Sequence, residues 1–167
     1  MHLVQTGDGQ AYQLLFTRYK DPVWSYVFRR VRDQQSASEI YQEVFLRVWR
    51  FAKTFQSGSK VRPWIYRIAS NVIKDQYRKS TREITTTTLE GLAPSGRLHD
   101  PIATHDLEKA IDQLPETLKE AFLLGALQGL DHKEVADALG ISPANARARV
   151  SRARVKLREL LRTGGAQ

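Results

Sequence analysis

The sequence predicts an all-α protein made of two helical domains that a flexible linker joins. Apolar residues recur at the spacing of amphipathic helices through most of the chain, and no run alternates apolar and polar side chains as a half-buried strand would. Between the two helical stretches lies a segment with Thr, Gly and Pro that lacks this periodicity. We therefore expect domains at residues 1–80 and 104–167 and a linker at residues 81–103.

The composition indicates a folded chain with a polyanionic partner. The 167 residues are 41% hydrophobic, which is enough to build a core, and their formal net charge is +8. The chain has no Cys, which excludes disulfides, thiol nucleophiles and thiolate metal sites. It shows neither an apolar run long enough to cross a bilayer nor an N-terminal secretion signal. We expect a soluble, cytoplasmic protein without membrane insertion.

The first domain is expected to be a bundle of about four helices. Asp21-Pro22 is expected to separate the first two, because proline interrupts helices. The third helix begins with Ser36 or Ser38 as its N-cap, and the fourth begins near Pro63, which suits a first helical turn. The apolar side of the third helix follows the amphipathic template at Tyr41, Val44, Phe45, Val48, Trp49 and Ala52.

The fourth helix mixes cations with aromatic and amide side chains. That mixture suits unstacked single-stranded bases, because aromatic rings stack on bases while cations hold phosphates. Trp64 lies on the apolar side and is expected in the core. Tyr66 and Tyr77 are the freer candidates for stacking.

The segment from residue 131 to 161 predicts a helix-turn-helix. Asp131 can cap a short helix that ends at Gly140, and Ser142-Pro143 fits the N-cap and first residue of a long helix. Two helices joined by a short turn, the second strongly basic, are typical of this DNA-binding arrangement. One apolar stripe runs along the long helix at Ala146, Val150, Ala153, Leu157 and Leu160.

The charge of this long helix favours DNA over a merely solvated surface. From residue 143 to 158 it carries six cations and no acid, so it repels itself and forgoes stabilising ion pairs along the helix. Asn145, Arg147 and Arg149 lie in the first turns, where a recognition helix meets base edges in the major groove. Arg152 and Arg154 lie further along and suit phosphate contacts better.

Two stretches of the chain resemble a known family. The run SASEIYQEVFLRVWRFAKTF and the later VRPWIYRIASNVIKDQYRK resemble region two of the extracytoplasmic-function (ECF) group of bacterial RNA polymerase sigma factors. The run IDQLPETLKEAFLLGALQGLDHKEVADALGISPANARARVSRARVKLREL resembles region four of the same group. The resemblance implies a factor that binds RNA polymerase core and directs promoter recognition, DNA melting and initiation. It implies no catalytic centre, cofactor or metal.

The same resemblance assigns the site residues and partners. Region two would grip the clamp helices of the largest polymerase subunit through Glu39, Gln42, Glu43 and Arg47. It would open and read the −10 element through Phe55, Ser57, Lys60, Asn71, Lys74, Asp75 and Arg78. Region four would rest on the flap of the second-largest subunit and read the −35 element through Asn145, Arg147, Arg149, Arg152 and Arg154. An anti-sigma factor is a further expected partner.

Some positions depart from the pattern of that family. Ser38-Glu39 stands where an acidic pair is common, which leaves one carboxylate for the clamp contact. In the recognition helix, Asn145-Ala146 replaces a common Thr-Val and Ala148 replaces a frequent Ser. The −35 sequence is therefore not predicted.

Three other functions compete with this interpretation. A stand-alone helix-turn-helix regulator usually dimerises, and the sequence offers no spare dimerisation helix. An enzyme is disfavoured because the four His are scattered and no Gly-rich phosphate loop is present. An anti-sigma or adaptor protein that binds polymerase without DNA leaves the basic recognition helix unexplained.

Overall fold

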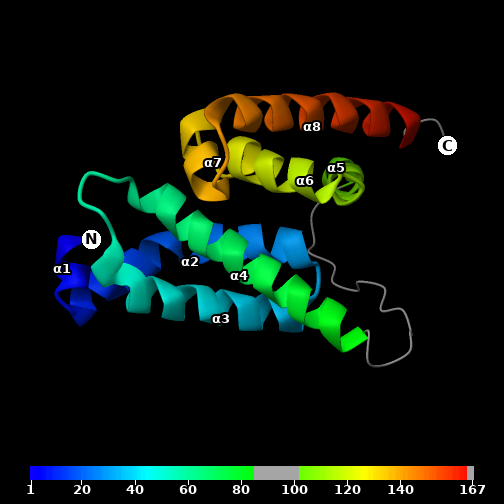
Figure 1. The fold of residues 1–167 in the computed structure, drawn as a ribbon. Coiled ribbons are helices and arrows are strands. Elements are labelled where there is room, and N and C mark those ends of the chain that lie inside the picture. Colours follow the sequence, from blue (N-terminus) through cyan, green and yellow to red (C-terminus); the bar gives the residue numbers. More distant parts are fainter. Residues whose placement is uncertain (85–101, 165–167) are drawn as a thin grey trace. The chain divides into compact units, whose positions relative to one another are not determined.

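The computed structural model describes residues 1–84 and 102–164, with side chains described for residues 1–79 and 106–163. The chain divides into two compact units, Met1–Gly96 and Arg97–Gln167, and no strand occurs in the described residues (Figure 1). Within those residues, no helix is long and apolar enough to cross a membrane. The all-α prediction is confirmed.

The expected linker of residues 81–103 is too long at both ends. Helix α4 continues to Ile84, and helix α5 begins at Ile102. The remainder of that prediction, residues 85–101, lies outside the described residues.

In its described residues, 1–84, the first unit has three long helices and one short one. These are α1 (His2–Gln5), α2 (Gly9–Val31), α3 (Gln34–Phe51) and α4 (Val61–Ile84), with the 3-10 turn η1 (Ala52–Thr54) after α3. Helices α2, α3 and α4 pack on one another (Figure 1). The expected number of about four helices is confirmed, but the expected break at Asp21-Pro22 is wrong, because the first two expected helices are the single helix α2 and the short α1 precedes it.

Helix α2 runs through Pro22 without a break. A proline inside a helix removes the hydrogen bond to the carbonyl four residues earlier, which here belongs to Arg18. Arg18 is exposed, so water can satisfy that carbonyl. The same face of the helix stays buried beyond the proline, at Val23, Tyr26 and Val27, and this packing offsets the lost bond.

Helix α3 starts earlier than expected. Its N-cap is Asp33, whose carboxylate accepts a hydrogen bond from the backbone N–H of Ser36 at 2.7 Å. This bond lowers the pKa of Asp33, because it favours the charged carboxylate. Ser36 and Ser38 are thus inside the helix. The predicted apolar side is otherwise confirmed at Val44, Phe45, Val48 and Ala52, whereas Tyr41 is half-buried and Trp49 remains 42% exposed.

The second unit holds the predicted helix-turn-helix. Its elements are α5 (Ile102–Asp112), α6 (Glu116–Phe122), the π-helical turn η2 (Leu123–Leu127), α7 (His132–Leu139) and α8 (Pro143–Gly164). Asp131 forms a capping box with Glu134 at the start of α7, and Gly140 ends that helix with a left-handed φ of 67°. The Ser142 hydroxyl accepts from the backbone N–H of Asn145 at 3.2 Å. The predicted caps of both helices are confirmed.

Helix α8 lies along α5, α6 and α7 and buries its small apolar residues against them (Figure 1). Ala146, Val150, Ala153 and Leu157 are at most 4% exposed, as the predicted stripe requires, and Leu160 is half-buried. One close approach is at Gly125 in η2, where a Cβ atom would lie 3.2 Å from Cγ2 of Val150. Glycine therefore lets α8 approach this turn more closely than a larger residue would.

We predict that Gly125→Leu destabilises the second unit by about 1–3 kcal/mol, because the added side chain has no space beside Val150. The three Trp of the chain all lie in the first unit, so their fluorescence reports its unfolding separately. In urea, the circular dichroism transition of the variant should begin at lower denaturant while its Trp fluorescence transition stays unchanged. Gly9→Leu is the control, since a Cβ at Gly9 meets no atom within 4 Å. Equal effects of the two substitutions would contradict the close-packing argument.

Candidate functional site

The polar side of α3 carries the residues expected to bind polymerase. Glu39 and Gln42 are exposed, and Glu43 and Arg47 are half-buried. Leu46 lies among them and is 58% exposed, which makes it an apolar side chain on an otherwise polar surface. Sequence analysis missed Leu46, although its position outside the apolar stripe was the available signal. An exposed Leu surrounded by polar groups suits the centre of a protein interface.

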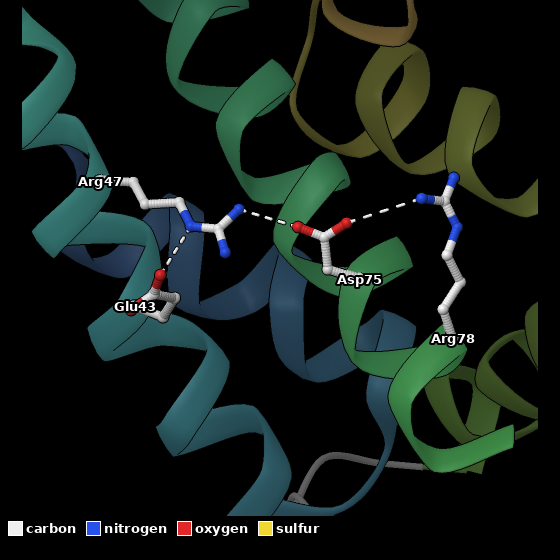
Figure 2. Close-up of polar contacts among 4 residues, drawn as sticks. All are labelled: Glu43, Arg47, Asp75 and Arg78. Carbon is white, nitrogen blue, oxygen red and sulfur yellow. Dashed lines mark hydrogen bonds and ion pairs between the residues drawn. The ribbon is translucent and has the colours of Figure 1, made fainter. Parts of the chain in front are cut away.

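Two of these residues form an ion-pair network with helix α4 (Figure 2). Arg47 donates from Nε to Oε1 of Glu43 at 2.6 Å and from Nη1 to Oδ2 of Asp75 at 2.9 Å. The other carboxylate oxygen of Asp75 lies 3.9 Å from Nη1 of Arg78. The bond to Glu43, followed by the one to Asp75, raises the pKa of Arg47. Residues expected to face polymerase and residues expected to face DNA thus meet in one network.

The residues expected to contact the −10 element differ in exposure. Ser57, Lys60, Asn71 and Arg78 are exposed, and Lys74 and Asp75 are half-buried. All six are on the surface of the loop after η1 or of helix α4.

Phe55 differs from the rest of this set because it is only 8% exposed. Its ring packs edge-on against Trp64 with a centroid distance of 5.3 Å, and its carbonyl accepts from Nε2 of Gln5 at 2.7 Å. These contacts anchor the start of the loop to α1 and α4. The ring is therefore not a surface group in this structure, and the expected direct contact of Phe55 with DNA stays a prediction.

The aromatic residues of α4 lie in different environments. Tyr66 is fully buried and packs edge-on against Tyr26. The prediction that Tyr66 is free to stack on a base was therefore wrong. Burial raises the pKa of Tyr66, because it disfavours the charged phenolate. Trp64 is half-buried against Phe55, and Tyr77 is 45% exposed, with its hydroxyl donating to the carbonyl of Arg30 at 3.0 Å. Tyr77 keeps an exposed ring that a base could stack on.

The outer surface of α8 is basic, as the sequence predicts. Asn145, Arg147, Arg152 and Arg154 are all exposed. The small apolar stripe holds the opposite side of the helix against its own unit. This arrangement leaves the cations on the surface of the unit.

Arg149 is the exception among these residues. Its Nη1 lies 3.3 Å from Oε1 of Glu120 on α6, and its Nε donates to Oδ1 of Asn145 at 3.2 Å. Its side chain is 21% exposed, and that of Glu120 is 5% exposed. The residue therefore points toward its own unit. Sequence analysis missed Glu120, because the two residues are 29 positions apart and no local pattern joins them.

Comparison with protein families identifies both units. The family model described as Sigma-70 region 2 matches residues 15–83, and the one described as Sigma-70, region 4 matches residues 104–157. The first match covers α3, the following loop and nearly all of α4. The second covers the helix-turn-helix.

Curated relatives match nearly the whole chain. RNA polymerase sigma factor SigZ of Bacillus subtilis is 36% identical over 88% of this chain and 85% of that protein. The sigma factor CarQ of Myxococcus xanthus is 33% identical, over 96% of this chain and 95% of that protein. The ECF RNA polymerase sigma-E factor of Escherichia coli is 30% identical, over 90% of this chain and 86% of that protein.

Solved structures share the fold at lower identity. The sigma factor RpoE of Bartonella quintana, solved in complex with the anti-sigma factor NepR, aligns with a TM-score of 0.80 at 23% identity. That alignment covers 92% of this chain and 98% of the other. CnrH, solved with the cytosolic domain of CnrY, aligns with a TM-score of 0.74 at 21% identity, over 97% and 94% of the two chains.

We predict that Arg47→Ala lowers the free energy of unfolding of the first unit by about 1 kcal/mol, since it removes both ion pairs between partly exposed groups. Urea unfolding followed by Trp fluorescence measures the change. Arg50→Ala, at an exposed position one turn later on α3, is the control and should stay within about 0.5 kcal/mol of the parent chain. In a double-mutant cycle, additive effects of Arg47→Ala and Asp75→Asn would mean that the pair contributes nothing.

Proposed function

We propose how this chain acts from the premise that it belongs to the ECF group of RNA polymerase sigma factors. It binds RNA polymerase core, directs it to promoters and takes part in opening the duplex for initiation. The observation that best supports this function is the presence of region 2 and region 4 in one chain, the second with an exposed basic recognition helix. The chain supplies promoter specificity, polymerase supplies catalysis, and both act in the cytoplasm.

The polymerase contact is proposed on the polar side of α3. Leu46 forms its apolar centre, and the exposed Glu39 and Gln42 form its rim toward the clamp helices. Glu43 and Arg47 lie at the margin, where Arg47 also bonds to Asp75. Mutating those two residues changes the stability of the unit as well as the contact, so Leu46 and Glu39 are the better residues with which to test it.

The −10 contact is proposed on the loop at residues 56–60 and on the outer side of α4. Lys60, Lys74 and Arg78 offer cations to phosphates, and Ser57 and Asn71 offer hydrogen bonds to an unstacked base. Flipping a base out of the duplex costs a few kcal/mol, which contacts in such a loop offset. Phe55 acts indirectly, because it anchors the start of the loop against Trp64.

The −35 contact is proposed on α8. Asn145 and Arg147 lie in its first turns and are exposed, as base readout in the major groove requires. Arg152 and Arg154 are placed on phosphates, which fix the register of the helix. Region 4 also rests on the flap of the second-largest subunit.

An anti-sigma factor is proposed as the regulator of this chain. The proteins of similar fold, RpoE and CnrH, were each solved in a complex, RpoE with an anti-sigma factor and CnrH with the cytosolic domain of CnrY. The exposed apolar side chains of Leu46 and Trp49 on α3 offer a surface to such a partner. A regulator that covers this surface competes directly with polymerase.

The first test of the polymerase contact is co-elution of the purified chain with bacterial core polymerase. Leu46→Asp should weaken the association at least about tenfold, because it places a charge at the centre of a buried interface. Leu14→Asp, at a 74% exposed position on α2, should leave it unchanged. The circular dichroism of both variants should match that of the parent chain.

Either of two results would contradict this proposal. Normal co-elution of Leu46→Asp would remove this surface from the polymerase contact. Failure of the unmodified chain to bind core, combined with tight binding of the free chain to duplex DNA, would favour a stand-alone regulator instead.

The −35 proposal predicts a change in the salt dependence of promoter binding. Arg154→Ala should weaken binding of the holoenzyme to all promoter sequences alike and reduce the slope of log affinity against log salt by about 1, since one phosphate contact is lost. Arg162→Ala, near the end of the same helix, should leave the slope unchanged. Fluorescence anisotropy over a salt series measures both. An unchanged slope for Arg154→Ala would remove the residue from the phosphate contacts.

A further inference from the structure

A chain of three polar side chains runs from inside the second unit to the start of its recognition helix. Glu120 on α6 pairs with Nη1 of Arg149 at 3.3 Å, and Nε of Arg149 donates to Oδ1 of Asn145 at 3.2 Å. The Ser142 hydroxyl caps the backbone N–H of the same Asn145 at 3.2 Å. Asn145 is thus held both by its backbone and by its side chain.

Burial fixes the inner end of this chain. Glu120 is only 5% exposed, and a buried carboxylate is costly unless cations and hydrogen bonds compensate it. Turning Arg149 toward DNA would remove one of those compensating groups. The guanidinium therefore stays with Glu120, and that carboxylate largely neutralises its charge.

The chemistry of the guanidinium sets the orientation of the asparagine amide. Arginine can only donate hydrogen bonds, so the group it contacts on Asn145 must be the carbonyl oxygen. The amide nitrogen then points away from Arg149, and both of its N–H groups remain available to DNA. Adenine is usually read by asparagine through oxygen and nitrogen together, whereas guanine N7 and O6 and thymine O4 only accept.

From this geometry we infer that Arg149 is a positioning residue and that Asn145, oriented by it, selects a base of the −35 element whose major-groove edge presents acceptors and no amino donor, guanine or thymine. The inference rests on the proposed function, because it concerns the same recognition helix. It replaces the expected direct reading of a base by Arg149. One base contact of α8 thus depends on a carboxylate buried in α6.

The test uses holoenzyme assembled from core polymerase and the full chain, with transcription from a promoter library randomised through the −35 element. Asn145→Ala identifies the position that Asn145 reads, where a preference for guanine or thymine of about tenfold should disappear. Arg149→Ala should change the preference at that same position and admit adenine, because the amide can then rotate. The double variant should show the same loss of preference at that position as Asn145→Ala alone, because Arg149 then has no amide to orient.

Two more variants separate orientation from stability and from general affinity. Asn145→Asp keeps the bond to Arg149 but turns an acceptor toward DNA, so the preference should move to the amino groups of cytosine or adenine. Arg152→Ala is the matched control and should lower transcription from all templates alike. Because Asn145 is exposed, its variants remain informative even if Arg149→Ala fails to fold.

The inference is overturned if the unmodified chain prefers adenine at the position of Asn145, or if Asn145→Asp leaves the preference unchanged. It is also overturned if Arg149→Ala relaxes a different position, since Arg149 would then read a base of its own. A holoenzyme that transcribes from no template in the library overturns the proposed function instead. The two failures are therefore distinguishable.

Discussion

Helix α8 packs so closely on the turn η2 that a methyl group at Gly125 would lie 3.2 Å from Cγ2 of Val150. The small residues Ala146 and Ala153 continue this contact along the helix. Close packing of this kind leaves few alternative rotations, since a rotated helix would bring larger or charged groups into the core. This contact and the rest of the buried stripe determine which side of α8 faces the core and which side carries the exposed cations. The proposed −35 surface therefore depends on the core beneath it.

The six cations between residues 143 and 158 of α8 have different environments, although the sequence shows them as one basic run. Arg147, Arg152 and Arg154 are exposed and add to the field that attracts phosphates. Arg149 lies on the inner margin of the same helix, where Glu120 takes up its charge. Arg149 is two residues from Arg147, about half a turn around the helix, and this difference places it against its own unit while Arg147 stays exposed. Counting cations overestimates the number available to DNA.

Arg47 has a comparable place in the first unit, between helices that are proposed to meet different partners. It bonds to Glu43 on its own helix α3 and to Asp75 on α4, and Asp75 in turn lies near Arg78 (Figure 2). Groups that are only partly exposed hold each other more firmly than fully solvated pairs do. The network therefore links the side of α3 proposed to face polymerase to the side of α4 proposed to face DNA.

The sequence by itself determined the features that depend on neighbours a few residues away. These include the caps Asp131, Gly140 and Ser142 and the apolar stripe of α8, because turn chemistry and helical periodicity are local. Only the tertiary structure decided that α2 continues through Pro22 and that Arg149 pairs with Glu120. Both outcomes depend on packing between segments distant in the chain, which can offset a lost hydrogen bond or bury a charge. A local sequence pattern contains no information about such contacts.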